Sequence, residues 1–381
     1  MRSTEISMKP FSKFWAIALC VCAGACSDKL PTSSGGSGGR AFRPSGDNTS
    51  GAGFGVSGLL FENNLIMWDR ENDGNRNELF SQMYFTRLDV SDFPVWGAFP
   101  EQYLASGGVP RDGIPALVNP RFVSASSSEL SYLRDDDLVL GTVINNEAKA
   151  YPENILWWHE IINDKAGGED VIMTLCPLTG TGMLFRAPEN SNNADRLELM
   201  PVVETTWRKW RELHPTTKVV SGDTNFDRDY TNYPYSTYRD EEVPPLFGIR
   251  TGQYNSQFAP KHTVLGLFVG DVQKAYPFSR LASRPVINDE VNGSEILIVS
   301  ELDEKLAIPY ERTVDGRVLT FKLESSEPFV MTDNETNSSW DIKGRAVSGE
   351  LRGKQLVQIP AHNAFWFAWS VFWPETLILD Q

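Results

Sequence analysis

The chain has 381 residues, of which 41% are hydrophobic, and a formal net charge of −15. This length and apolar content indicate a globular protein with a sizeable core. The acidic balance argues against a nucleic-acid partner, because binding a phosphate backbone requires clustered Lys and Arg side chains that displace counterions.

Residues 1–25 are predicted to be a signal peptide. Lys9 and Lys13 precede an apolar run from Phe14 to Ala25, which is too short to span a bilayer but suits the hydrophobic region of an export signal. The run ends in AGAC at Cys26, which resembles the bacterial lipobox, where the cysteine is lipidated and becomes the new N-terminus. We therefore expect an exported lipoprotein, anchored to the membrane through Cys26, on the periplasmic or outer-membrane face of a Gram-negative cell. Cleavage without a lipid is the alternative.

Residues 26–50 are expected to form a flexible tether, because Ser33 to Gly39 contains only Ser and Gly. The folded domain is expected over residues 51–381. Of the four cysteines, Cys20 and Cys22 lie in the signal peptide and Cys26 would carry the lipid. Cys176 is therefore expected to be a lone thiol with no disulfide partner.

The loop DRENDGNRNE, residues 69–78, is a candidate calcium site. Asp69, Glu71 and Asp73 alternate along it and Gly74 stands at the sixth position, as at the start of a calcium-binding loop. Its last acid stands at the tenth position rather than the twelfth, so a solvated hairpin tip is the alternative. No other cofactor is expected, because the histidines lack the i, i+4 spacing of a zinc site.

Two pairs of segments indicate an internal duplication. Val139 to Phe185 aligns without a gap onto Val264 to Tyr310 at an offset of 125, and Leu197 to Val220 aligns onto Leu356 to Leu379 at an offset of 159. Within the first pair, each copy contains a segment that begins with KAYP and ends with IND, at residues 149–164 and 274–289. These shared residues are expected to form the common scaffold.

Each half is predicted to contain a β-hairpin, a short helix, two apolar strands and a closing helix with tryptophans. In the first half these lie at residues 138–151, 155–161, 171–175, 182–186 and 207–213. Thr205 or Thr206 can cap the last helix, and Pro215 ends it. Its counterpart at residues 365–373 is apolar on all sides and should be buried. The predicted fold is α+β, predominantly antiparallel β, with two pseudo-equivalent β-rich halves at about 54–222 and about 240–381.

The two halves differ in the position of one segment. The second half has residues between Tyr310 and Leu356 that the first half lacks, and they include FVMTDNE at residues 329–335. The best counterpart is LIMWDRE at residues 65–71, within the block Phe54 to Arg87. We therefore predict a permuted connection, in which this N-terminal block packs beside the strands at residues 171–186.

The motifs AYPENILWWHEIIND, CPLTGTG, GVSGLLFENNLIMWDR, ELMPVVETTW and NAFWFAW resemble the uncharacterised bacterial family catalogued as domain of unknown function 3179. The resemblance covers Gly53 to Leu379 and implies no established activity. In that family the GVSGLL block usually follows the CPL strand, whereas here it precedes it. The family also often has CPLC where this chain has CPLT at residues 176–179, so the chain lacks the second thiol of a CxxC pair.

Residues that differ between the copies are where function is expected. His159 corresponds to Arg284, and Cys176 corresponds to Glu301. A thiolate with an imidazole partner is an activated nucleophile, so Cys176 and His159, with Asp164 or Glu160 orienting the histidine, form a candidate acyl-transfer site. The alternative is a buried cysteine beside a helix-capping histidine.

A second group of residues is a candidate ligand site: Trp158, Glu160, Thr179, Gly180 and Thr181. The glycine-rich turn could offer backbone N–H groups to an anion, and the tryptophans could stack on a sugar ring. A tight turn and a core helix are the alternatives. The sequence thus predicts an exported, lipid-anchored binding or structural protein, with a thiol-dependent enzyme as the alternative. Its partners are the membrane, through the lipid, and an unspecified protein or small molecule.

Overall fold

The computed structural model describes residues 59–62, 65–68, 88–89, 114–187, 197–245 and 255–380. These belong to two units, one of Met1–Pro115 with Pro188–Leu197 and the other of Ala116–Ala187 with Glu198–Gln381. In the first unit, β1 (Leu59–Glu62), β2 (Leu65–Trp68) and β3 (Leu88–Asp89) form a small antiparallel sheet in the order β1-β2-β3. The second unit contains both halves of the repeat.

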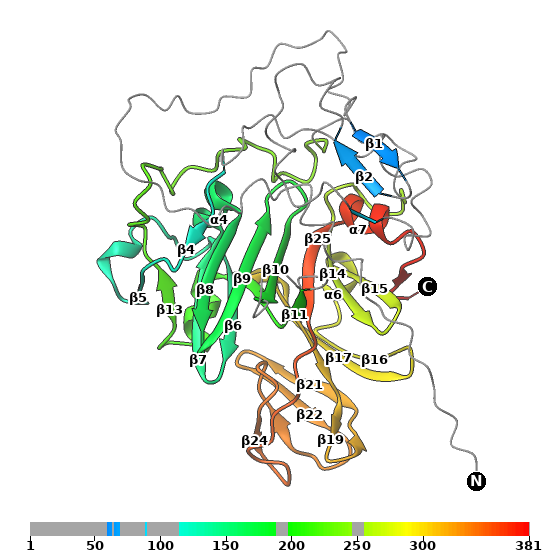
Figure 1. Cartoon of the computed structure of the whole chain (residues 1–381). Helices are drawn as coiled ribbons and strands as arrows, with labels where there is room; N and C mark the ends of the chain where they lie inside the picture. The colour runs from blue at the N-terminus through cyan, green and yellow to red at the C-terminus, as the bar shows by residue number, and fades with distance from the viewer. Residues whose placement is uncertain are drawn as a thin grey trace, which may run out of the picture. The chain divides into compact units, whose positions relative to one another are not determined.

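The first half is built of short strands and two short helices (Figure 1, cyan and green). Its elements are β4 (Leu117–Val118), β5 (Phe122–Ser124), η2 (Ser128–Leu130), β6 (Leu138–Ile144), β7 (Glu147–Pro152), α4 (Glu153–His159), β8 (Ile161–Ala166), β9 (Glu169–Cys176), β10 (Thr181–Arg186), β11 (Glu198–Met200), β12 (Val203–Thr206), α5 (Trp207–Leu213) and β13 (Lys218–Val220). The strands form two sheets, β11-β10-β9-β8-β4 and β12-β6-β7-β13-β5. Pairing is antiparallel except for β4 on β8 and β13 on β7.

The second half follows the same plan (Figure 1, yellow to red). Its elements are β14 (Thr263–Val269), β15 (Val272–Pro277), α6 (Phe278–Leu281), β16 (Val286–Val291), β17 (Ser294–Glu301), η5 (Leu302–Glu304), β18 (Leu306–Glu311), β19 (Thr313–Val314), β20 (Arg317–Val318), β21 (Phe321–Ser326), β22 (Phe329–Asp333), β23 (Ser339–Trp340), β24 (Ala346–Ser348), β25 (Ala361–Phe365), α7 (Trp366–Phe372) and β26 (Leu377–Ile378). The sheets are β25-β14-β15-β26, β16-β17-β18, β19-β20 and β21-β22-β23-β24. The fold is therefore mostly antiparallel β with a few short helices, as predicted.

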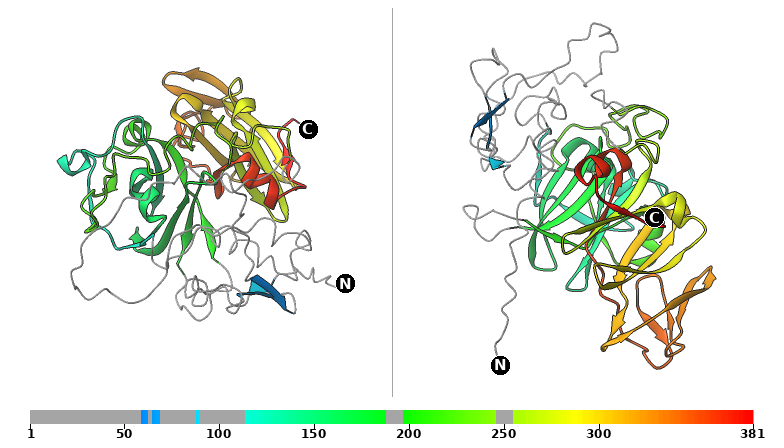
Figure 2. Two further views of the ribbon diagram at one scale, coloured as in Figure 1. Left: turned by 90° about the horizontal axis from the view of Figure 1, so that it is seen from above. Right: turned by 90° about the vertical axis from the view of Figure 1, so that its right-hand side faces the viewer.

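Strand registers repeat between the halves, which supports the predicted duplication. Val139 pairs with Pro152 in the first hairpin, and Val264 pairs with Pro277 in the second. The parallel pairing of β13 on β7 likewise recurs as β26 on β15. Each register matches the offsets of 125 and 159 seen in the sequence, so the two halves share one backbone plan, and Figure 2 shows them side by side.

A glycine and a tryptophan are retained in both copies because they touch. A Cβ atom built on Gly141 would lie 2.4 Å from the Trp210 ring, and one on Gly266 would lie 2.1 Å from the Trp369 ring. Each indole nitrogen donates to a threonine hydroxyl, at 3.0 Å from Trp210 and 2.9 Å from Trp369. Only glycine leaves room for the ring on β6 and β14. The prediction that the second-half helix is buried is confirmed for Trp366 to Ser370, whereas the last residues of α7, Val371 and Phe372, are half-buried.

The segment between Tyr310 and Leu356, which the first half lacks at this position, forms a separate sheet of β21 to β24. Its β21–β22 hairpin closes with Ser326 opposite Phe329, and the β1–β2 hairpin closes with Glu62 opposite Leu65, so both have the same loop length. This supports the predicted correspondence of residues 65–71 with 329–335. Residues 54–58, 63–64 and 69–87 of the N-terminal block lie outside the described residues, and its packing beside residues 171–186 stays a prediction.

Each half places its tryptophan helix against a turn of the other half. Thr206 caps α5 by accepting from Lys209 N, and its hydroxyl also bonds the Glu304 carboxylate next to β17. At the equivalent place in the other half, Phe365 N donates to Thr179 O at 2.8 Å. The turn between β9 and β10 is therefore held by the second half of the chain.

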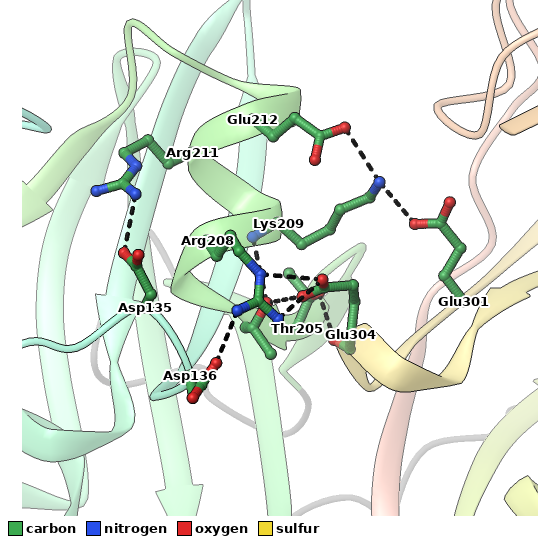
Figure 3. Close-up of polar contacts among 10 residues, drawn as sticks. Asp135, Asp136, Thr205, Arg208, Lys209, Arg211, Glu212, Glu301 and Glu304 are labelled. Carbon is green, nitrogen blue, oxygen red and sulfur yellow. Dashed lines mark hydrogen bonds and ion pairs between the residues drawn. The ribbon is translucent and has the colours of Figure 1, made fainter. Parts of the chain in front are cut away.

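The α5 contact is a network of charged side chains (Figure 3). Arg208 bonds Glu304 at 3.0 Å and Asp136 at 2.8 Å, and Lys209 bonds Glu301 at 2.7 Å. Several charges arranged as a network stabilise more than isolated surface pairs do. Glu301, the counterpart of Cys176, thus has a structural role in joining the halves.

Candidate functional site

The side chains that α4 presents are covered by a single later segment, residues 224–240, which we call the tyrosine segment. It follows β13 and contains Tyr230, Tyr233, Tyr235 and Tyr238. Lys261 fixes it by donating to the carbonyl oxygens of Tyr238 and Asp240, and the Tyr238 hydroxyl donates to Leu178 O at 2.8 Å. The segment therefore touches both α4 and the turn after Cys176.

His159, the last residue of α4, is fully buried and bonded to this segment. Its Nε2 lies 2.6 Å from the Tyr230 hydroxyl, which in turn lies 2.5 Å from the Thr224 hydroxyl. Asn154 Nδ2 donates to Tyr230 O at 3.0 Å, and the Phe226 ring lies 5.0 Å from the imidazole. The histidine thus belongs to a hydrogen-bonded chain that runs from α4 to Thr224.

Glu160 ends α4 in a conformation that is unusual for a residue with a side chain. Its φ is 54°, its N–H donates to Leu156 O at 2.8 Å, and its carbonyl accepts from Leu175 N at 2.8 Å. The side chain is 5% exposed, and Tyr235 hydrogen-bonds the carboxyl group. Within the part of the chain that the structure describes, Glu160 Oε2 has no hydrogen-bond partner. Burial raises the pKa of Glu160 to about 8, while the Tyr235 bond opposes this rise.

Aromatic rings and guanidinium groups cover the rest of α4. The Trp157 and Tyr233 rings meet edge to face at 4.9 Å, and Arg239 lies 4.0 Å and 4.2 Å above them. Arg228 lies 5.7 Å above Trp158, whose buried indole nitrogen has no partner in the described chain. Trp158 is half-buried and Arg239 is exposed, so this surface remains partly open to solvent.

Cys176 lies at the end of β9, is buried, and is disulfide-bonded in the unprocessed chain; the lone thiol expected after cleavage at Cys26 stays a prediction. Its partner sulfur lies outside the described residues. Backbone register brings Cys176 close to His159, since Leu175 bonds Glu160 and Thr174 pairs with Ile161. The structure therefore brings the two predicted residues to one end of the sheet, and a catalytic role for them stays a prediction.

Thr179 and Gly180 lie in the turn from β9 to β10, and Thr181 is the first residue of β10. Thr179 N donates to Cys176 O at 3.2 Å, and Gly180 has a φ of 58°. A Cβ on Gly180 would lie 2.8 Å from the Phe365 ring, which explains the glycine. The structure therefore has the tight turn, and a ligand role for these residues stays a prediction.

Asp164 does not orient His159. Its Oδ2 accepts from Lys149 Nζ at 2.7 Å and from the Tyr151 hydroxyl at 2.8 Å. Lys274 and Tyr276 bond Asp289 in the same way, at 2.6 Å each. The shared KAYP and IND motifs therefore hold a structural ion pair in each half, and Asp164 belongs to the scaffold.

The predicted calcium ligands Asp69, Glu71 and Asp73, and the lipid anchor Cys26, lie outside the described residues. Among the residues that the structure describes, no three His, Cys, Asp or Glu side chains gather as metal ligands would. In the same residues, no helix is both long and apolar enough to cross a membrane.

The sequence interpretation missed the tyrosine segment. Its signal was the stretch DRDYTNYPYSTYRD, residues 227–240, where aromatic and arginine residues alternate with loop-forming residues and have no counterpart in the repeat. Aromatic side chains in such a loop indicate either packing on a scaffold or ligand contact. Here the aromatic side chains pack on the scaffold around His159 and leave Trp158 and Arg239 partly accessible to solvent.

Comparison with known proteins gives one match. A family model described as a protein of unknown function (DUF3179) matches residues 111–194 and 184–376, which is more than half of the chain. No curated protein and no solved structure matches it.

Proposed function

The chain belongs to this family of unknown function, and we propose from its site that it is an exported, lipid-anchored protein that binds a ligand on α4 and the tyrosine segment. The first half alone contains this site. The second half has a four-residue helix, α6, in place of α4. The proposal therefore assigns ligand binding to the first half and support to the second.

The observation that carries the proposal is Glu160. A residue with a side chain in the left-handed region costs about 1–3 kcal/mol of strain. A buried polar atom without a partner costs about 1–3 kcal/mol more. Natural proteins retain such costs where a ligand or a reaction needs them. Glu160 combines both, which supports a binding role for its free carboxyl oxygen.

The surrounding surface has the chemistry of a ligand site. Trp158 offers a half-buried ring and an indole N–H, while Arg228 and Arg239 lie over aromatic faces. Rings give a ligand apolar contact area, and guanidinium and carboxyl groups give it direction. A polar ligand with a flat or ring-shaped part fits these groups.

A thiol-dependent acyl transfer by Cys176 and His159 is supported less well. It requires a thiolate that a substrate can reach, whereas Cys176 is only 7% exposed. The imidazole nitrogen that could accept a thiol proton already bonds the Tyr230 hydroxyl. Binding requires neither a free sulfur nor a change of this bond.

Export and anchoring rest on the N-terminal sequence that ends at Cys26. The Cys26→Ser variant tests them in a bacterial host. Detergent-phase partition of the parent protein, lost in the variant, supports lipid anchoring. Equal partition of both proteins into the detergent phase contradicts it.

The proposed binding site is tested by measuring whether Glu160 contributes to the free energy of unfolding. Glu160→Gly relieves the left-handed strain and removes the buried carboxyl, so the free energy of unfolding should rise by about 1–3 kcal/mol. Lys305→Gly is the matched control, because Lys305 also has a left-handed backbone, with a φ of 56°, and has no buried carboxyl. If Glu160→Gly lowers the stability below that of the control, Glu160 is a structural residue and the proposed site is wrong.

A further inference from the structure

A serine, a histidine and a glutamate near the start of the second half are hydrogen-bonded in a row at the protein surface. The Ser279 hydroxyl lies 3.0 Å from His262 Nε2, and His262 Nδ1 lies 3.1 Å from Glu241 Oε1. Ser279 is exposed, and the side chains of His262 and Glu241 are 17% and 52% exposed. We call these three residues the serine triad. None of them belongs to α4 or to the tyrosine segment.

The contacts of His262 show which of its nitrogens carries the proton. The backbone N–H of Ser279 also donates to His262 Nε2, at 3.4 Å. A backbone N–H can only donate, so Nε2 is an acceptor and carries no proton. The proton of the neutral imidazole is therefore on Nδ1, where the Glu241 carboxylate accepts it. In this form Nε2 can take the hydroxyl proton of Ser279.

The backbone around the serine triad is held in place by packed residues. His262 O accepts from Trp366 N at 2.8 Å, and the Phe258 ring stacks on the imidazole at 5.3 Å. Lys261 is buried next to His262 and donates to the carbonyl oxygen of the residue before Glu241. Reactive side chains are most effective when rigid parts of the fold hold them. Lys261 thus ties the histidine to the segment that supplies the glutamate.

The first half has the same backbone arrangement with different side chains. At the offset of 125, His262 corresponds to Asp137 and Ser279 to Asn154. Asp137 O accepts from Trp207 N at 2.7 Å, and Asn154 Nδ2 donates to Asp137 Oδ2 at 3.2 Å. The two positions therefore touch in both halves. In the first half they hold a buried amide and a carboxylate, whereas in the second half they hold an exposed hydroxyl and an imidazole.

A hydroxyl, an imidazole and a carboxylate bonded in this order are the groups that activate a serine for nucleophilic attack. We propose that Ser279 is a nucleophile that hydrolyses carboxylic esters, with His262 as its general base and Glu241 as the positioning residue for His262. Because Ser279 is exposed, an ester group carried on a large molecule can reach it. This activity does not depend on ligand binding at α4.

The reaction balances with an ester and water as the reactants. Ser279 Oγ bonds the carbonyl carbon while its proton passes to His262 Nε2, and the ester C–O bond breaks as the alcohol leaves with that proton. Water then attacks the acyl-serine and gives a proton to His262. The imidazole returns this proton to Ser279 Oγ as the carboxylic acid leaves. The Glu241 carboxylate stabilises the imidazolium that forms at each attack.

Labelling of the whole chain with a fluorophosphonate tests the nucleophile. This probe bonds an activated serine oxygen through its phosphorus atom and releases fluoride. Mass spectrometry should find the label on Ser279 and not on Ser283, an exposed serine of the same segment that is the matched control. A label that is absent from Ser279, or equal on both serines, overturns the proposal.

Hydrolysis of p-nitrophenyl acetate by the whole chain measures the complete reaction. A general base contributes about 10²–10⁴-fold, so Ser279→Ala and His262→Gln should each lower the rate by about 10²-fold or more. Ser283→Ala should leave the rate unchanged. Because Ser279 is exposed, Ser279→Ala keeps the fold even if His262→Gln does not. Hydrolysis by Ser279→Ala as fast as by the parent overturns the proposal.

Glu241→Gln tests the positioning residue, because it retains an oxygen that can accept from His262 Nδ1 and removes the charge. The rate should fall, and the rising limb of its pH profile should move to lower pH, since the imidazolium loses the carboxylate that favours it. Arg280, which lies 5.4 Å over the Phe258 ring, is a nearby charge that this variant leaves in place. A rising limb that does not move shows that Glu241 does not act on His262.

Discussion

Trp210 packs against Gly141 on β6, so close that a Cβ atom there would be 2.4 Å from the ring. Gly141→Ala should therefore lower the free energy of unfolding by about 1–3 kcal/mol, because a packed core resists an added methyl group. Chemical denaturation measures this. Combining it with Trp210→Phe should recover part of the loss, since the smaller ring makes room. Strictly additive effects of the two changes would contradict the contact.

Asp164 should be more important for stability than its counterpart Asp289. The Lys149–Asp164 pair is 6% exposed on each side, whereas Lys274 and Asp289 are 12% and 16% exposed. Asp164→Asn leaves a buried ammonium group without its charge partner and should cost about 3–5 kcal/mol. Asp289→Asn should cost about 1–3 kcal/mol, because water reaches that pair more easily. Equal losses in denaturant melts would show that burial does not set the difference.

Glu160 should make the protein less stable as the pH rises. The folded state raises its pKa from 4.5 to about 8, so the folded chain binds this proton more tightly than the unfolded chain. The contribution of Glu160 to the free energy of unfolding should therefore be largest below about pH 4.5, fall as the pH rises to about 8, and level off above that. Glu160→Gln should reduce this slope. An unchanged slope in the variant would place the titration elsewhere.

Processing at Cys26 should change the state of Cys176. Cleavage there removes Cys20 and Cys22, and lipidation uses the thiol of Cys26, so a processed chain has no cysteine left to hold Cys176 in a disulfide. Because Cys176 is buried in the fold, the test is made in denaturant without reductant, where iodoacetamide should modify Cys176 in the anchored form and not in the unprocessed chain. Mass spectrometry of the peptide that contains Cys176 reads this directly. Anchored protein whose Cys176 resists alkylation even in denaturant would contradict the expectation.

The common scaffold of strands and turns could be predicted well, because the sequence contains it twice. Lys149 and Asp164 recur as Lys274 and Asp289, and the same spacing forces the same register on β7 and β15. The helix near residue 155 was also predicted, although it begins and ends about two residues earlier than expected. It ends there because Glu160 adopts the left-handed conformation, which no pattern of apolar residues indicates.

The environment of His159 could not be predicted in the same way. Its partner Tyr230 comes from a segment that has no copy and no periodic pattern, and chain folding alone brings it to α4. The pairing of Glu204 with Asn363 was hidden for a different reason. Their shared position in the repeat was visible in the alignment, but nothing in a linear sequence says that equivalent positions of two halves touch.

Each half contacts a turn of the other half, so neither half of the unit is complete on its own. One continuous apolar cluster includes Trp210 of the first half and Trp340 of the second. Each half also rests its tryptophan helix on the other, through Glu304 in one direction and Thr179 in the other. A half on its own would expose both a core face and an unoccupied turn. Each half thus serves the other as the second subunit of a dimer would, with the two subunits joined in one polypeptide.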